Sequence, residues 1–332
     1  MQFGPVPLKH AVGAILAHSV GTASGRLRKG LVLTEEHIET LRSEGQEQII
    51  VAKPEHGDIP EDVAADRLAK AMAGPNVLRT DAFTGRVNLI APGPGVAVLN
   101  AQAIRQLNGI DPMISCATVP EFQQMAQGGM IATVKIISYA VNGANLEAAC
   151  EAARQSIDFA PVTLGTADLF ITEVPGGPGS AGEDAIRGRL EALGMTLSAV
   201  QTCPHKTEPL SSRIAASTAD LILVLTGSAT SDPNDVAPSA LRAAGGTVTR
   251  FGMPVDPGNL LFVGDRNGTP VIGLPGCARS PALNGADWVL SRIACGLPVS
   301  SDDIASMGVG GLLKEIPTRP QPRARRLPKT AS

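Results

Sequence analysis

The sequence lacks an excess of positive charge. Charged residues make up 18% of its 332 residues, and the formal net charge is -3 at pH 7. Nucleic acids and anionic membranes recruit proteins through strong positive fields, which this composition does not supply. We therefore predict no nucleic-acid partner, and a small ligand or another protein as the binding partner.

The chain also lacks paired cysteines and long apolar runs. Its five cysteines are odd in number and form no CxxC motif, which is typical of proteins in a reducing compartment. No run approaches the roughly 18 consecutive apolar residues of a membrane span, and the N-terminal segment has no secretory signal pattern. These absences predict a cytoplasmic protein with no membrane partner.

Glycine and proline are abundant and are spread among apolar periodic segments. The 36 glycines and 26 prolines predict a turn-rich globular protein. We predict a mixed α/β region over residues 1–75, a β-rich module over 76–160, an α/β domain over 161–312 and a flexible basic tail over 313–332. Strands and helices alternate in the third region, which predicts a three-layer sandwich with a mostly parallel sheet, preceded by a mixed α+β region.

Three loops of the α/β region combine glycine with hydroxyl side chains. They follow strands expected to end near Val174, Leu225 and Ile272, and the carboxyl ends of parallel strands meet at one edge of a sheet. Glycine lets backbone amides approach a phosphate closely, because it has no Cβ. The first loop also has a GxGxxG spacing, so an NADP site with His205 and Lys206 on the 2′-phosphate is an alternative.

The second and third of these loops resemble a known family. They are similar to the phosphate- and nucleotide-binding loops of the molybdopterin-binding fold, which molybdopterin adenylyltransferases, molybdotransferases and gephyrin share. The matching residues are Thr226, Gly227, Asp235, Val236, Pro238, Pro257, Gly258, Gly273, Leu274, Pro275, Gly276 and Ser280. The residues that depart from the family pattern are Ser228, Ala229, Thr230, Asp256 and Cys277.

The resemblance covers roughly residues 165–300 and extends weakly into the N-terminal half. It is strongest to bacterial chains in which such a region precedes a cytidylyltransferase domain. It implies a protein that binds molybdopterin or the molybdenum cofactor and presents it to a separate cytidylyltransferase or to a molybdoenzyme. A magnesium-dependent adenylyltransferase or molybdotransferase that uses a nucleotide, and a nucleotide hydrolase of the competence-damage type, are the alternatives. Related domains also imply a homo-oligomer.

The resemblance further implies roles for individual residues. Asp235 and Asp232 are the catalytic candidates, and Asp235 is also the candidate ligand of a metal ion. The candidates for binding the pterin phosphate are Gly227, Ser228, Thr230, Ser231, Gly276, Arg279, Ser280, His205 and Lys206. His205 and Lys206 stand where related enzymes carry acidic residues, so binding is favoured over independent adenylyl transfer.

Structural roles compete with several of these assignments. Asp235 can cap the following helix, and Asp232 can be a solvated turn residue. The hydroxyls of Ser228, Thr230 and Ser231 can bond within the turn. Arg279 can be an ordinary surface charge.

Overall fold

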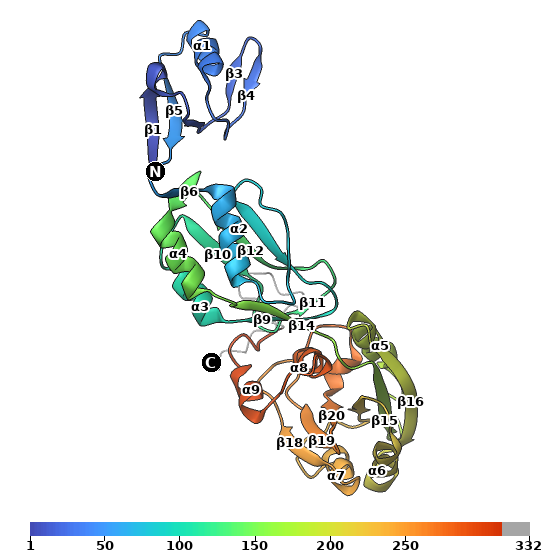
Figure 1. Ribbon diagram of the computed structural model, residues 1–332. Helices are drawn as coiled ribbons and strands as arrows, with labels where there is room; N and C mark the ends of the chain where they lie inside the picture. Colours follow the sequence, from blue (N-terminus) through green and yellow to red (C-terminus); the bar gives the residue numbers. More distant parts are fainter. Residues whose placement is uncertain (314–332) are drawn as a thin grey trace, which may run out of the picture. The chain divides into compact units, whose positions relative to one another are not determined.

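The computed structural model describes residues 1–313, so all but the first residue of the expected basic tail lies outside the described part (Figure 1). Contacts divide the chain into two units. Unit 1 comprises Met1–Gly93 and Ala97–Phe159, and unit 2 comprises Pro94–Val96 and the chain from Ala160 onward. Each unit is described by itself.

Unit 1 begins with a small antiparallel sheet. Its strands lie in the order β1 (Gln2–Pro7), β5 (Gln48–Lys53), β2 (Ile15–Leu16). A hairpin of β3 (Val20–Thr22) and β4 (Gly25–Leu27) follows in the chain, and then helix α1 (Glu35–Ser43). Thr34 and His37 form a capping box at the start of α1, which satisfies backbone N–H groups that the first turn leaves unpaired.

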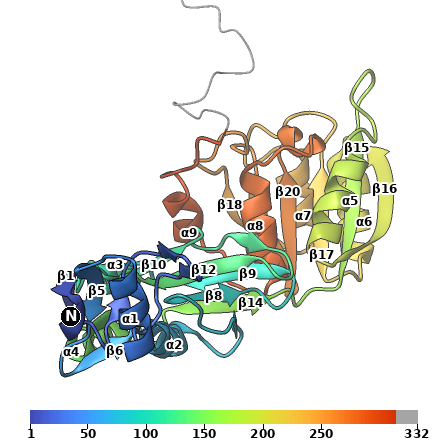
Figure 2. The same ribbon diagram turned by 90° about the horizontal axis from the view of Figure 1, so that it is seen from above.

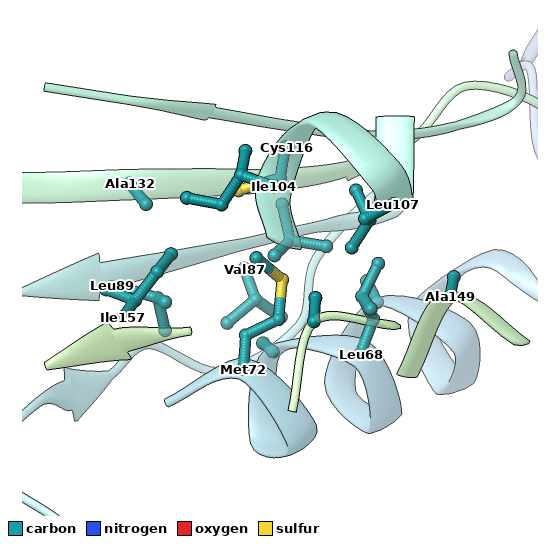
Figure 3. Packing of buried hydrophobic residues seen from close by; sticks show 14 of the residues in the cluster. Leu68, Met72, Val87, Leu89, Ile104, Leu107, Cys116, Ala132, Ala149 and Ile157 are labelled. Atoms are coloured by element: carbon teal, nitrogen blue, oxygen red, sulfur yellow. The ribbon is translucent and has the colours of Figure 1, made fainter. Parts of the chain in front are cut away.

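The remainder of unit 1 is strand-rich and carries three helices. One sheet has the order β10 (Ile114–Thr118), β12 (Met130–Ile136), β8 (Arg86–Ile90), β7 (Leu78–Arg79). A second has the order β11 (Gln124–Met125), β9 (Gly95–Leu99), β14 (Ile157–Pro161), and β6 (Asp58–Pro60) pairs with β13 (Ala140–Asn142). The helices are α2 (Glu61–Met72), α3 (Ala101–Asn108) and α4 (Gly143–Ala152). Their apolar faces pack on the strands in one core, part of which Figure 3 shows.

Unit 2 is an α/β domain around a six-stranded sheet. The strand order is β16 (Thr196–Pro204), β15 (Thr166–Glu173), β17 (Leu221–Leu225), β20 (Thr269–Leu274), β19 (Phe262–Arg266), β18 (Thr247–Phe251). The first four strands are mutually parallel, and β19 and β18 are antiparallel to their neighbours. The expected mostly parallel sheet is confirmed.

Helices cover both faces of this sheet, which gives the three expected layers. The helices are α5 (Glu183–Ala192), α6 (Thr207–Ala216), α7 (Val236–Ala243), α8 (Gly285–Ala294) and α9 (Ser301–Ser306). Strand β17 shows why two layers are needed. Leu221, Leu223 and Leu225 join one core with α5 and α8, while Ile222 and Val224 join another with α6 and α7. Each such side chain contributes about 1.5–3 kcal/mol when it leaves water.

An Asn-Gly hairpin connects β19 and β20 in unit 2. Asn267 and Gly268 have φ angles of 54° and 87°, the left-handed pair that a type I′ turn requires. Gly268 N also donates to the Asp265 carboxylate at 2.8 Å. The asparagine-glycine pair therefore fixes the register of the two strands.

Two further findings concern membrane spans and thiols. Within residues 1–313, no helix has the length and apolar character needed to cross a membrane. Cys116, Cys150, Cys203 and Cys295 are buried thiols. Burial raises the pKa of Cys116 to about 12 and that of Cys295 to about 11, so both stay protonated and unreactive at neutral pH.

Candidate functional site

The three glycine-rich loops leave neighbouring parallel strands at one edge of the unit 2 sheet. The first loop (174–182) follows β15, the second loop (226–235) follows β17, and the third loop (275–284) follows β20. Strand β17 pairs with β15 on one side and with β20 on the other, and Figure 2 shows the three strands side by side. The rule that parallel strands end at a common edge therefore holds for these loops.

Gly227 is required by the packing of the second loop on β15. A Cβ at this position would lie 2.6 Å from the carbonyl oxygen of Thr172 and 3.1 Å from the backbone nitrogen of Val174. The amide of Gly227 donates to the hydroxyl of Thr172 at 3.0 Å. This glycine thus lets two loops approach each other, and its N–H is bonded inside the protein.

Arg279 connects the third loop to the other two. Its Nη1 donates to the carbonyl oxygens of Gly179, at 3.1 Å, and of Ala181, and its Nη2 donates to that of Thr226 at 3.0 Å. A Cβ on Gly182 would lie 2.6 Å from the Arg279 Cα, so the first and third loops are in close contact. Burial lowers the pKa of this guanidinium, which nevertheless stays charged at neutral pH.

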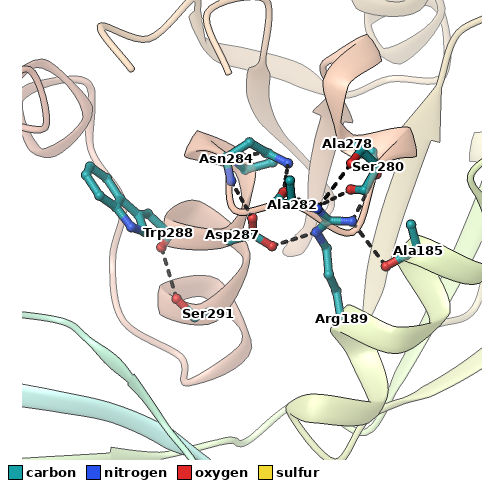
Figure 4. Close-up of polar contacts among 10 residues, drawn as sticks. Ala185, Arg189, Ala278, Ser280, Ala282, Asn284, Asp287, Trp288 and Ser291 are labelled. Atoms are coloured by element: carbon teal, nitrogen blue, oxygen red, sulfur yellow. Dashed lines mark hydrogen bonds and ion pairs between the residues drawn. The ribbon is translucent and has the colours of Figure 1, made fainter. Parts of the chain in front are cut away.

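Arg189 holds the third loop from helix α5 (Figure 4). Its side chain is only 9% exposed and bonds the Asp287 carboxylate at 2.6 Å. The same guanidinium donates to the carbonyl oxygens of Ala185, Ala278, Ser280 and Ala282 at 2.8–3.1 Å. Asp287 in turn accepts from Asn284 N at 2.8 Å in the capping box of α8. The sequence pattern did not identify Arg189, because its partners outside its own helix lie 89 to 98 residues further along the chain.

The start of the third loop is open. Gly276 is exposed, and a Cβ there would meet no heavy atom within 4 Å. Ser280 closes the short 3-10 helix Gly276–Arg279, and its hydroxyl accepts from Ala282 N at 3.2 Å. The surroundings of Gly276 leave room for a ligand to approach the backbone, in contrast to those of Gly227.

Both candidate aspartates accept backbone hydrogen bonds in the second loop. Asp235 caps α7, accepting from Val236 N at 2.7 Å and from Ser231 N at 3.1 Å. Asp232 accepts from Asn234 N at 2.7 Å. The part of the chain that the structure describes contains no group of three or more His, Cys, Asp or Glu residues arranged to hold a metal ion. Asp235 therefore has the helix-capping role, and Asp232 has the turn role, that compete with their candidate functions.

The hydroxyl groups of the second loop divide into two sets. Thr230 is 5% exposed and its hydroxyl lies 3.3 Å from that of Thr226. Ser228 and Ser231 are exposed. These two serines can donate to a ligand, whereas Thr230 points into the protein.

The two basic residues after β16 occupy different environments. The ring nitrogen Nδ1 of His205 lies 2.8 Å from the Thr172 hydroxyl, and the backbone N of His205 donates to Glu173 O at 2.9 Å. Lys206 is exposed at the start of α6. His205 is thereby held beside the Gly227 segment, and Thr172 is a second site residue that the sequence did not reveal.

Comparison with family models identifies two segments of the chain. Residues 180–293 match the model described as "Probable molybdopterin binding domain", and they include the second and third loops. Residues 5–53 match the model of a domain of unknown function. A search of curated proteins gives no match.

Solved structures give distant similarities. A molybdopterin biosynthesis MoeA protein from Pyrococcus horikosii is 14% identical, with 89% of this chain and 75% of that chain covered and a TM-score of 0.33. A molybdenum cofactor biosynthesis protein from Pyrococcus furiosus is 11% identical, with 96% and 66% covered and a TM-score of 0.22. TM-scores this low do not establish a shared overall fold with either structure.

Proposed function

Because residues 180–293 match the model of a probable molybdopterin binding domain, we propose that the chain serves molybdenum cofactor biosynthesis. In this proposal it binds molybdopterin or the molybdenum cofactor at the three loops. The phosphate end of the pterin contacts the exposed serines Ser228 and Ser231 and the open backbone at Gly276. Hydroxyl and amide donors on a preorganised loop suit a phosphate, since they need little rearrangement on binding.

The observation that supports this proposal most directly is the joining of the three loops by two arginines. Arg279 bonds carbonyl oxygens in the first and second loops, and Arg189 holds the third loop against α5. With carbonyl oxygens engaged by the arginines, the exposed serine hydroxyls and the open backbone at Gly276 face an approaching anion. Loops fixed in this way lose little conformational entropy when a ligand binds.

We favour binding and presentation over catalysis by this chain. The carboxylates of Asp235 and Asp232 are engaged with backbone N–H groups. His205 and Lys206 follow β16 and add donors for an anion. A separate cytidylyltransferase, or a molybdoenzyme, would then receive the bound pterin.

A fluorescence titration tests the binding. Molybdopterin released anaerobically from a molybdoenzyme should give a saturable change with the full chain. The double variant Ser228→Ala/Ser231→Ala should bind at least about tenfold more weakly, because a hydrogen bond to a charged group is worth about 1.5–3 kcal/mol. Ser212→Ala, an exposed serine on α6, is the matched control and should bind as the wild type does. No saturable change with the wild type would refute the proposal.

The second candidate, a magnesium- and nucleotide-dependent transferase, draws on Asp232 and Asp235 lying in one loop. Pyrophosphate release is measured with molybdopterin, Mg²⁺ and either ATP or CTP, and the binding proposal predicts none. Asp235→Asn separates the roles of this side chain, because asparagine also caps helices but carries no charge for a metal. Release by the wild type that is lost in Asp235→Asn would establish the transferase.

A further inference from the structure

The hydroxyl group of Thr172 occupies a buried position between two parts of the site. Thr172 lies near the end of β15 and is 0% exposed. Its Oγ1 lies 3.0 Å from the backbone nitrogen of Gly227 and 2.8 Å from Nδ1 of His205. One side chain therefore contacts both the second loop and the residue that follows β16.

Counting donors and acceptors determines the direction of these bonds. A threonine hydroxyl offers one hydrogen and two lone pairs. The amide of Gly227 can only donate, so it takes one lone pair. If Nδ1 carried a proton, that N–H would donate to the second lone pair of the Thr172 oxygen. The hydroxyl hydrogen of Thr172 would then have no acceptor among residues 1–313. A buried donor without an acceptor is unfavourable, so the hydroxyl donates to Nδ1.

We propose that Thr172 is a positioning residue that fixes His205 as the neutral tautomer with its proton on Nε2. The ring then presents Nε2–H as a directional donor, and Thr172 ties the ring to Gly227, the residue before Ser228 in the second loop. No hydrogen bond of Nε2 occurs within the described residues, and His205 as a residue is half-buried. The chain Gly227 N–H to Thr172 O–H to His205 Nδ1 orients the loop and the imidazole together.

In the proposed function, the Nε2–H group of His205 donates to the ligand, and this part of the inference rests on that function. A phosphate or pterin oxygen at the second loop accepts from His205 Nε2–H and from the Ser228 hydroxyl. A neutral imidazole selects a ligand by direction, whereas the ammonium of Lys206 attracts an anion from any direction. Thr172 thereby sets the specificity of the site without contacting the ligand.

The tautomer is measured by long-range ¹H–¹⁵N NMR of the histidine rings in the full chain without ligand. The spectra are recorded at about pH 8.5, where an ordinary imidazole is neutral, and His205→Gln assigns the signals. The wild type and Thr172→Ser should show Nδ1 without a proton and Nε2 protonated. Thr172→Val should show both tautomers, and Thr202→Val on the neighbouring strand β16 should match the wild type.

Two results would overturn the inference: a protonated Nδ1 in the wild type, or ring signals in Thr172→Val identical to those of the wild type. The wild-type spectrum decides the tautomer by itself, so an unstable Thr172→Val protein leaves the test intact. Molybdopterin affinity is measured on the same proteins. The affinity should fall by about tenfold in Thr172→Val, because a neutral hydrogen bond is lost. It should return to the wild-type value in Thr172→Ser, which keeps the hydroxyl.

The two proposals fail in different ways. If the ring has the expected tautomer and no variant binds molybdopterin, the proposed function is wrong and the positioning role stands. If the wild type binds molybdopterin and its His205 carries the proton on Nδ1, the positioning role is wrong and the proposed function stands.

Discussion

At the scale of single residues, two glycines with the same expected role have different surroundings. Both Gly227 and Gly276 were expected to let a ligand approach the backbone. The structure shows that Gly227 is required by contact with β15, whereas the Cβ position of Gly276 is open. Their substitution by alanine should therefore separate stability from binding.

Gly276→Ala should change the free energy of unfolding by less than about 0.5 kcal/mol and weaken molybdopterin binding. Gly227→Ala should lose about 1–3 kcal/mol of stability, because its Cβ overlaps the backbone of β15. Urea denaturation and fluorescence titration measure the two quantities. Gly188→Ala, with open space at a helical position of α5, is the control and should bind normally. Unchanged affinity in Gly276→Ala would mean that the ligand does not lie against this loop.

At the scale of elements, the third loop is positioned by a helix. Arg189 on α5 makes five polar contacts to Asp287 and to backbone carbonyls, four of them beyond its own helix. The planar guanidinium can reach several acceptors at once, which a lysine ammonium cannot. The loop conformation should therefore depend on an arginine at this position.

Arg189→Lys should lower the unfolding free energy by about 1.5–3 kcal/mol, the worth of hydrogen bonds to a charged group, and should weaken molybdopterin binding. The matched control is Arg187→Lys on the same helix, whose ion pair with Glu183 is partly exposed. Such i,i+4 pairs contribute only about 0.3–0.5 kcal/mol. Equal effects of the two substitutions in urea denaturation would contradict the assigned role of Arg189.

The cap of helix α7 gives a second prediction at this scale. Asp235→Ala should cost about 1 kcal/mol of stability, because Val236 N and Ser231 N lose their acceptor. Asp235→Asn should restore most of that loss. Thermal unfolding of the two variants measures the difference, and an asparagine variant as unstable as the alanine variant would show that charge matters more than capping.

Local sequence patterns predicted many elements of unit 2, but they could not predict hydrogen bonds between residues that are distant in sequence. The apolar run Leu221–Leu225 is typical of a strand buried on both faces, and Asn267–Gly268 is a pair typical of a two-residue hairpin; the structure has both. The order of strands, with β15 between β16 and β17, depends on how the helices cross the sheet, which periodicity does not encode. Thr172 and Arg189 were missed because their partners are distant in sequence.

At the scale of the whole molecule, the chain has two units with separate cores. The proposed binding site lies in the loops of unit 2. Residues 5–53 of unit 1 match a domain of unknown function. We propose that the chain acts in the cytoplasm as a homo-oligomer and passes its ligand to a separate cytidylyltransferase.

The most direct test of the central claim is native mass spectrometry of the full chain after anaerobic incubation with molybdopterin. The account predicts a complex whose added mass equals molybdopterin. That complex should be strongly reduced in Gly276→Ala and in Ser228→Ala/Ser231→Ala, and retained in Ser212→Ala. No complex with the wild type, or equal complex formation in all four proteins, would contradict binding at the three loops.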